Sequence, residues 1–342
     1  MLPILLILVI AGLLTTSFML ESMDAVTLKY QKEQKTYQAL LEAKAALIGW
    51  SAKHTSLPGS LPCTDITNDG TARSSGQSCV AYIGRLPWRT LGIGDLRDGD
   101  GECLWYALTP IYRNVLPTSA RNAASSNQIN VTVPGSLTVK NADGSTAPIN
   151  PVIAVIFSTG SPLGGQDRAD ISGGTCGGNY TAANYLETLN AVNNATGNVA
   201  GSSYTFTRGI ASDTFNDKLM VITTSDLYRP VRKRIVREIM GKTNTTDGVH
   251  RYFVDNGTYL CPSATVLGGP GDCSVVPPSV TGYANNAGMG LNYPVLGNWL
   301  ANNNWFGVTS YVYISPTNVS VSITDALGTY SCIANSGLVT CS

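Results

Sequence analysis

The first 20 residues constrain this chain more than any other part, because they contain no charged side chain. At a rise of about 1.5 Å per residue, about 20 apolar residues in a helix span the hydrocarbon core of a bilayer. The helical pattern then continues, since neither Pro nor Gly occurs between Gly12 and Gly49 and apolar residues recur with a period of about 3.6. We therefore expect residues 1–54 to form one N-terminal helix, about 75 Å long.

Other interpretations of this segment are a secretory signal peptide and a plain single-span membrane protein. A signal peptide would start with basic residues and end in a small-residue cleavage site soon after the apolar run, and the sequence has neither. The second half of the expected helix carries only one apolar stripe, which suits packing on a sheet. This division favours a helix that begins in a membrane or a helix bundle and continues into a globular head.

The eight cysteines predict disulfides in an oxidising compartment. None forms a CxxC pair and the chain has only two histidines, which argues against a structural zinc site. Short loops suggest the pairs Cys63–Cys79, Cys261–Cys273 and Cys332–Cys341, and elimination leaves Cys103 with Cys176; spacing alone does not prove this connectivity. With 13% charged residues and zero net charge, the chain offers no bulk attraction for nucleic acid or anionic membrane.

A sequence of motifs occurs twice. Each copy has a helix, a Cys-loop-Cys segment, a turn with Leu, Pro and Gly, a Trp and an aromatic strand; the turns are residues 84–92 and 291–297. This order predicts a degenerate duplication. The second helix is expected at about 225–255, with Ser225 or Asp226 as N-cap and a possible interruption at 241–248. Strands are predicted at 130–140, 151–158, 204–208 and 219–223.

Several short strings resemble those of large prepilin-like proteins of Gram-negative bacteria: ALIGW, LPC, GRLPWRTLG, LWYAL, AVIFSTGSPLGGQDR and NYLE. The length and half-apolar design of the N-terminal helix resemble type IV pilins in particular. The resemblance implies an α+β fold in which a long hydrophobic N-terminal helix packs on an antiparallel β-sheet head, with a second pilin-like lobe of helix and sheet. We expect the N-terminal helix at 1–54, a first lobe at 55–222 and a second lobe at 223–342.

Pilins polymerise through the apolar part of this helix, so the resemblance implies a set of filament-assembly residues. They are Met1, Leu2, Leu5, Leu6, Val9, Leu13 and Phe18. One departure is Leu5, which stands where pilins have a Glu that neutralises a neighbouring subunit's N-terminal amine. No basic leader precedes the apolar run, which is expected if Met1 is the first residue of the mature chain. Certain tip pseudopilins and divergent pilin-like families also lack that Glu.

Two acidic segments are candidates for calcium binding. Asp65, Asn68 and Asp69 precede Gly70 as in the opening of a calcium loop, but Gly76 stands where a bidentate Glu is expected. A second run has glycines between its acidic residues Asp95, Asp98, Asp100 and Glu102. The calcium candidates are therefore Asp65, Asp69, Asp98 and Asp100. Turns stabilised by Asp side chains require the same residues without a metal, and this is the favoured interpretation.

Other candidate sites have simpler alternatives. Ser158 with His54 or His250 suggests a nucleophile, but the segment is not G-x-S-x-G and a turn after a buried strand explains it better. A cluster of basic residues has two interpretations, DNA binding or a solvated helix face: Arg229, Arg232, Lys233, Arg234 and Arg237. A set of aromatic residues also has two interpretations, the lining of a glycan groove or packing in the core: Trp88, Trp105, Tyr293, Trp299 and Trp305. Six N-x-S/T sequons signal accessible polar loops: Asn130, Asn179, Asn194, Asn244, Asn256 and Asn318.

The sequence predicts a structural protein without enzymatic activity or cofactor. We expect the subunit of an extracellular type IV pilus-like filament, anchored in the inner membrane before assembly. Its expected partners are other copies of itself and the pilus assembly machinery. The alternative is a minor or tip pilin, or a pseudopilin, which acts in adhesion, DNA uptake or secretion and binds a surface glycan or DNA.

Overall fold

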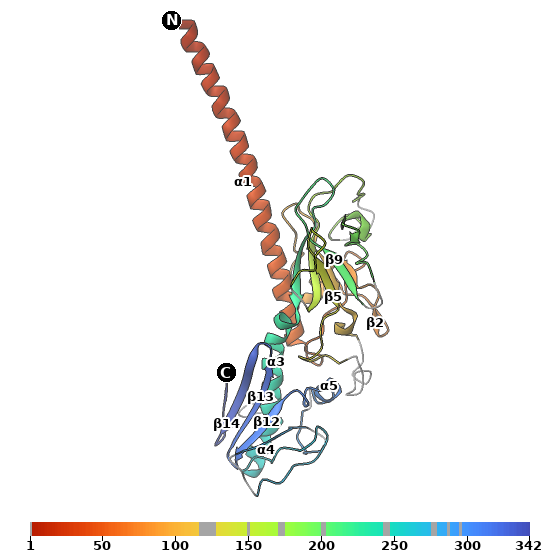
Figure 1. The fold of residues 1–342 in the computed structure, drawn as a ribbon, viewed down its shortest axis with the longest axis vertical. Coiled ribbons are helices and arrows are strands. Elements are labelled where there is room, and N and C mark those ends of the chain that lie inside the picture. The colour runs from red at the N-terminus through yellow and green to blue at the C-terminus, as the bar shows by residue number, and fades with distance from the viewer. Residues whose placement is uncertain are drawn as a thin grey trace.

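The computed structural model describes residues 2–115, 128–148, 151–169, 175–199, 203–241, 247–274, 279–285, 288–293 and 296–342, and for residues 2–25 it describes the backbone alone. Figure 1 shows a long helix, α1 (Leu2–Lys53), that leads into two bodies, each built on a β-sheet. The other α-helices are α2 (Trp88–Leu91), α3 (Thr224–Met240), α4 (Gly248–Asn256) and α5 (Gly297–Asn302). Single 3-10 turns occur at η1 (Pro110–Tyr112) and η3 (Ala182–Asn184).

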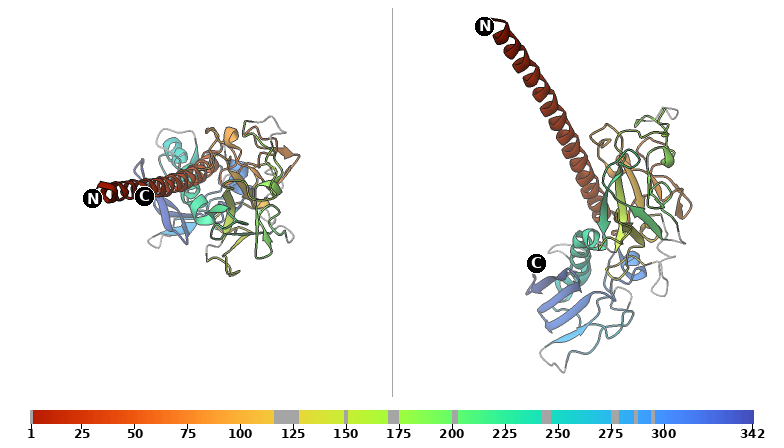
Figure 2. Two further views of the ribbon diagram at one scale, coloured as in Figure 1. Left: turned by 90° about the horizontal axis from the view of Figure 1, so that it is seen from above. Right: turned by 45° about the horizontal axis from the view of Figure 1, so that its top comes forward.

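Among the residues of α1 with described side chains, the buried ones lie in its C-terminal part. Buried side chains recur at intervals of three and four residues from Thr36 onward, as on one face of a helix. They are Thr36, Ala39, Leu40, Ala43, Leu47 and Ser51. Residues 26–35 are exposed on every side. The views of Figures 1 and 2 agree that the helix projects far beyond both bodies.

The first body contains a six-stranded sheet of order β3-β4-β6-β5-β9, with β10 also paired to β6. Its strands are β3 (Ile83–Arg85), β4 (Trp105–Leu108), β5 (Leu137–Lys140), β6 (Val152–Ser158), β9 (Tyr204–Thr207) and β10 (Lys218–Thr223). Every residue of β6 is buried, because this apolar run is covered on both faces, and α1 packs against β6 and β10. The sheet is mixed, since β5 and β9 are parallel.

Two small ribbons extend the first body. One pairs β1 (Ser74–Ser75) with β2 (Ser78–Cys79), and the other pairs β7 (Thr188–Leu189) with β8 (Val192–Asn193).

The second body is an antiparallel meander covered by α3. Its strands are β11 (Val280–Gly282), β12 (Ser310–Ser315), β13 (Asn318–Asp325), β14 (Gly328–Asn335) and β15 (Leu338–Cys341). In β13 the buried residues Val319, Val321 and Ile323 alternate with more exposed polar ones, as expected for a sheet with one covered face. The α3 helix packs on β13 and β14, and it also contacts α1, α4 and β10 of the first body. It therefore joins the two bodies (Figure 1).

The start of α3 differs slightly from its prediction. Its N-cap is Thr223, whose hydroxyl accepts the Asp226 N–H while the Asp226 carboxylate accepts the Thr223 N–H, a reciprocal capping box. The helix ends at Met240, and Gly241 follows with φ 81°. Because α4 begins only at Gly248, the predicted interruption at 241–248 is present.

The predicted fold is wrong in several respects. The chain is α+β, but its largest sheet is mixed, and the two bodies have unlike strand orders, so the second is not a copy of the first. The motifs matched because Cys loops and Pro-Gly turns are local features that do not specify strand pairing. Over the residues with described side chains, which start at Val26 and have the gaps given above, no helix is long and apolar enough to cross a membrane.

The predicted strands and disulfides agree more closely with the structure. Strands lie within or close to three of the four predicted ranges, whereas of 130–140 only residues 137–140 form a strand. All four predicted disulfides are present, with Cα–Cα distances of 4.0 to 5.8 Å. Only Cys103–Cys176 joins distant parts of the chain, with a separation of 73 residues.

Candidate functional site

The projecting helix carries an apolar stripe that nothing in the described chain covers. The exposed fractions are 70% for Val26, 62% for Tyr30, 56% for Tyr37 and 37% for Leu41. At about 100° per residue these four side chains lie within about 60° of one another around the helix axis. We call them the apolar stripe. Large apolar side chains gathered on one exposed helix face are typical of an interaction surface.

Ion pairs join the helix to the rest of the chain. Lys32 Nζ lies 2.8 Å from Asp100 Oδ1, Glu33 pairs with Lys218, and Lys44 Nζ lies 2.8 Å from Asp226 Oδ2. The hydrogen bond to Asp100 raises the pKa of Lys32. Gly99 also approaches the helix backbone so closely that an added Cβ would lie 2.2 Å from the Lys32 carbonyl oxygen. These contacts connect α1 near Lys32 and Glu33 to the first body.

Arg234 of α3 stabilises the end of α1. Its guanidinium donates hydrogen bonds to the carbonyl oxygens of Ala52, His54 and Thr55. A cation at this position satisfies carbonyl groups that have no partner within the helix and opposes the helix dipole. Burial, followed by the charge of Arg234, lowers the pKa of His54.

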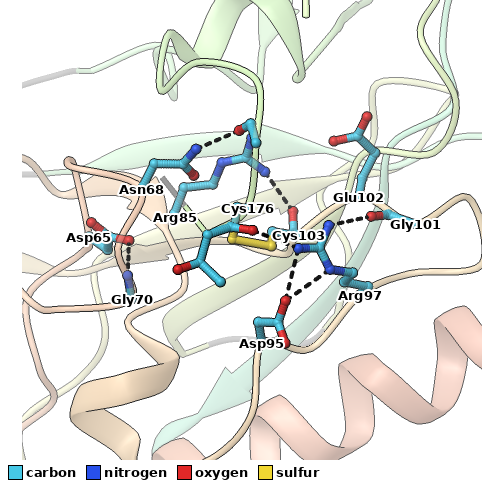
Figure 3. The surroundings of a disulfide bond; sticks show 12 residues. Asp65, Asn68, Gly70, Arg85, Asp95, Arg97, Gly101, Glu102, Cys103 and Cys176 are labelled. Atoms are coloured by element: carbon cyan, nitrogen blue, oxygen red, sulfur yellow. Dashed lines mark hydrogen bonds and ion pairs between the residues drawn. A yellow bond between two sulfur atoms is a disulfide. The ribbon is translucent and has the colours of Figure 1, made fainter. Parts of the chain in front are cut away.

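Both predicted acidic segments lie around the Cys103–Cys176 disulfide (Figure 3), but their carboxylates act within turns. Asp65 accepts the N–H groups of Thr67 at 2.8 Å and Gly70 at 2.7 Å. Asp98 is buried, and it accepts the Asp100 and Glu102 N–H groups through Oδ1. Its Oδ2 accepts the Ser158 hydroxyl and the Gly160 N–H.

The remaining calcium candidates are held by cations. Asp69 pairs with Arg73 at 2.6 Å and Asp100 with Lys32. Among the described residues no group of three or more His, Cys, Asp or Glu side chains could hold a metal ion. These contacts favour the turn interpretation over calcium.

Polar side chains connect the loops beside the same disulfide. Arg97 pairs with Asp95 at 2.8 Å and donates to the carbonyl oxygens of Gly101 and Thr175 (Figure 3). Asn68 donates to the Gly177 carbonyl oxygen. The loop at 65–70, the loop at 95–103 and the segment from residue 175 are thus tied together by polar bonds and one covalent bond.

Arg85 is the least expected member of this cluster. It is 1% exposed, and it donates to the carbonyl oxygens of Cys103 at 2.9 Å and Asn179 at 3.3 Å. Its guanidinium carbon lies 4.9 Å from the Trp105 ring centroid and 4.2 Å from that of Tyr185. Burial lowers the pKa of Arg85, and the aromatic faces help to stabilise its charge. The sequence analysis missed it because its position in a short strand carried no special signal.

The first body also contains a buried pair of carboxyl groups, Glu187 and Asp217, which the sequence analysis missed. Glu187 Oε2 accepts the Asn216 and Asp217 N–H groups at 3.0 Å, and Asp217 Oδ2 accepts the Glu187 N–H at 2.9 Å and Asn194 Nδ2 at 2.8 Å. Burial, followed by the charge of Glu187, raises the pKa of Asp217 well above its ordinary value. Oδ1 of Asp217 has no hydrogen-bond partner among the described residues.

The proposed nucleophile set does not assemble. The Ser158 hydroxyl donates to Asp98, whereas His54 Nδ1 accepts backbone N–H groups of its own loop. His250 is buried, and its Nδ1 lies 3.0 Å from the Tyr259 hydroxyl. Neither histidine is hydrogen-bonded to Ser158, so the turn interpretation of this segment stands.

The basic residues of α3 divide into two groups. Arg232 is buried against Asp325, and Arg234 caps α1. Arg229, Lys233 and Arg237 follow at intervals of four residues on the exposed face, and they have no ion pair among the described residues. Lys233 and Arg237 lie over the Tyr330 ring at 5.6 and 5.9 Å. This is a solvated helix face with an excess of positive charge.

The aromatic candidates are core residues. Trp105, Trp299 and Trp305 are at most 1% exposed and Tyr293 is 6% exposed. Trp88 is half-buried over Gly70, where an added Cβ would lie 2.3 Å from its ring. A glycan groove lined by these side chains is not present.

The sequon prediction is wrong for three positions. Asn130, Asn179 and Asn194 are at most 5% exposed, and each forms hydrogen bonds that organise a turn or loop. Asn256 is exposed and Asn318 half-buried, and Asn244 lies outside the described residues. Three sequons therefore do not mark accessible loops.

The filament-assembly residues cannot be placed, because their side chains lie outside the described part of the chain: Met1, Leu2, Leu5, Leu6, Val9, Leu13 and Phe18. The described residues define an α+β protein with four disulfides within the chain and a projecting amphipathic helix. In comparisons with protein-family models, curated proteins and solved structures, the chain matches none.

Proposed function

We propose that this chain is a structural subunit of an extracellular, type IV pilus-like helical filament that polymerises through its N-terminal helix. The observation that carries the proposal is the projection of α1, a continuous helix of 52 residues in which residues 26–35 stay exposed, although Lys32 and Glu33 form ion pairs with the first body. A subunit that must reach its neighbours through a filament axis needs such an extension. The projecting part also carries exposed Val26 and Tyr30.

The energetics of an isolated helix support assembly. A helix without tertiary contacts is marginal in water, and most helical stability in proteins comes from packing an apolar face. The side chains of residues 26–35 are not buried by any other described residue, and residues 1–20 carry no charge in the sequence. Contacts with other copies would cover both regions.

The disulfides and the low charge fit an exported location. Four disulfides suit an oxidising compartment, and 13% charged residues let subunits pack side by side without strong repulsion. In this proposal the filament lies on the cell surface, the subunit waits at the inner membrane before assembly, and its partners are other copies and the pilus assembly machinery.

A second candidate function is that of a minor or tip pilin, or a pseudopilin, in adhesion, DNA uptake or secretion. One observation favours it: the exposed row Arg229, Lys233 and Arg237 offers three positive charges without ion pairs in the described chain. Such a row would attract an anionic ligand such as DNA. A shaft subunit would need it covered by acidic groups of a neighbour.

Cryo-electron microscopy of sheared surface filaments tests the proposal. The subunit would be identified from side-chain density, and we expect this chain to repeat along the shaft with its first 20 residues at the axis. If the shaft is another protein and this chain occurs only at filament ends, the tip function replaces the shaft function. If cells that produce the chain assemble no filament containing it, both fail.

A further inference from the structure

The C-terminal part of the chain is almost free of charged side chains. Between Cys273 and Ser342 the sequence contains a single one, Asp325, although 13% of the residues in the whole chain are charged. Asp325 is largely buried, and its carboxylate forms an ion pair with Arg232 of α3. The strands of the second body, which all lie in this part of the chain, therefore present no charged side chain to solvent.

The five-stranded sheet of the second body has one covered face and one open face. Buried residues such as Val321 and Cys332 lie on the covered face, where α3 packs on β13 and β14. The alternate residues of β11 to β15 point the other way, and none of them is buried. Ile333 is 45% exposed and Leu338 66% exposed. We call the surface of these outward residues, at 281 and within 310–342, the outer sheet face; Figure 1 shows the sheet at the edge of the molecule, beside α3.

The register of the strands places the outward side chains in rows. One row consists only of small hydroxyl side chains: Ser310, Ser322, Ser331 and Ser342. The next row alternates larger and smaller side chains: Val312, Ser320, Ile333 and Thr340. Two such rows are about 7 Å apart, because they lie two residues apart along each strand. The outer sheet face thus has a shallow trough of serines beside a row that carries Ile333.

The composition of this face favours a second copy of the chain as its partner. Depletion of charged residues distinguishes the buried centre of a protein interface from the rest of a protein surface. A face that meets its own copy must also lack unpaired charges, since like charges would oppose each other, and this face has none. Tyr311, Tyr313 and Tyr330 are buried on the covered face, so the outer sheet face offers no aromatic ring on which a sugar could stack.

The area of the face is sufficient for a specific contact. Strands lie about 4.8 Å apart and advance about 3.4 Å per residue, which gives the outward surface of β11 to β15 about 500 Å². Two copies would together bury about 1,000 Å², which is the lower end of the range for biological interfaces. The contact is therefore large enough to be specific and small enough to be reversible.

We propose that the outer sheet face pairs with the same face of a second copy about a two-fold axis. The inference goes beyond the proposed function and does not depend on it. In this arrangement the serine row of each copy lies opposite the row of Ile333 in the other, so that larger side chains of one face enter the trough of its partner. Two sheets packed face to face in this way lie about 10 Å apart. Such a contact closes after two copies, so it does not build a filament by itself.

Charged substitutions at Ser331 test the proposal on the full chain in detergent solution. Ser331→Asp and Ser331→Arg each place like charges in the two paired faces, and each should weaken dimerisation about tenfold or more, measured by sedimentation equilibrium. An equimolar mixture of the two variants should recover most of the parent affinity, because opposite charges then face each other. Ser75→Asp and Ser75→Arg are matched controls at an exposed position of β1, and they should leave dimerisation unchanged.

The recovery in the mixture decides whether the contact joins two copies. A parent chain that stays monomeric, or a mixture that associates no better than either variant alone, would overturn the proposal. Ser331 points outward, so both variants should unfold at the same temperature as the parent, followed by circular dichroism. If they do not, the same pair of substitutions at Thr340, which is exposed on β15, gives the decision. A monomeric parent that binds chitin beads, with loss of that binding in both variants, would assign the face to a neutral polysaccharide and refute the pairing.

The outcomes separate this contact from the proposed function. If Ser331→Asp abolishes dimerisation in detergent while the variant still assembles into filaments, both the pairing and the filament function stand. If the parent dimerises and its mixed variants recover, but no filament contains the chain, only the proposed function fails. If filaments form from a chain that shows no dimer in detergent, only the pairing fails.

Discussion

Removal of the Cys103–Cys176 disulfide should destabilise the protein more than removal of any other. The bond closes a separation of 73 residues, whereas Cys332–Cys341 closes only 9. In the chain-entropy description, a closed loop of 73 residues corresponds to about 4.4 kcal/mol at 25 °C and one of 9 residues to about 2.6 kcal/mol. The expected difference between the two deletions is therefore about 2 kcal/mol.

The substitutions for this comparison are Cys103→Ala with Cys176→Ala, and as matched control Cys332→Ala with Cys341→Ala. All but Cys341 of these side chains are largely buried, so the loss of packing is similar in the two variants. Arg85 keeps its hydrogen bond, because the acceptor is the backbone carbonyl of residue 103. Equilibrium unfolding in urea, followed by circular dichroism, gives both free energies. Equal losses, or a larger loss in the control, would refute the argument from loop length.

Asp217→Asn should stabilise the protein at pH 7. The folded-state pKa of Asp217 is raised, so ionisation of this group lowers the free energy of unfolding as pH rises from the ordinary pKa near 3.8 through the folded-state pKa. The asparagine variant lacks this dependence. Urea unfolding from pH 3 to 8 tests it, and parallel curves of unfolding free energy against pH for the parent and the variant would refute the reasoning. Arg234→Met should cost about 2 kcal/mol through lost hydrogen bonds to carbonyl groups. It should also raise the pKa of His54 in an NMR titration, and an unchanged pKa would contradict the assigned contact. Ile235→Ala, at a fully buried site, should cost about 2–5 kcal/mol in thermal or urea unfolding, and a loss below about 1 kcal/mol would show that α3 packs loosely.

Features that depend on neighbouring residues were predictable. The apolar run at 151–158 matches β6 almost residue for residue. The apolar period of α1 was a poorer guide to its buried face: Leu40 and Leu47 are buried as expected, but most of the predicted stripe stays exposed. Three disulfides close loops of 9 to 16 residues, so their partners were the nearest cysteines in the chain. The interruption between α3 and α4 was visible in the polar residues that follow Gly241.

Features that depend on distant residues were missed. Arg85 is held by the carbonyl oxygen of Asn179, which lies 94 residues away, and the parallel pairing of β5 with β9 joins residues 137 and 204. The sequons at Asn130 and Asn194 looked exposed because polar residues surround them in the sequence, yet tertiary contacts bury both. The apolar stripe was partly visible in the sequence as helical periodicity, but the sequence did not show that it stays uncovered.

The sequence by itself indicated the helices, the main apolar strand and the three disulfides that close short loops, because side chains close in the chain set local geometry whatever surrounds them. The tertiary structure alone decided that the largest sheet is mixed, that Asp65 and Asp98 bind backbone N–H groups, and that among the described side chains of α1 the buried ones begin at Thr36. These outcomes depend on which distant surfaces bury one another, and the free energy of that burial is a property of the assembled contacts and of no single segment.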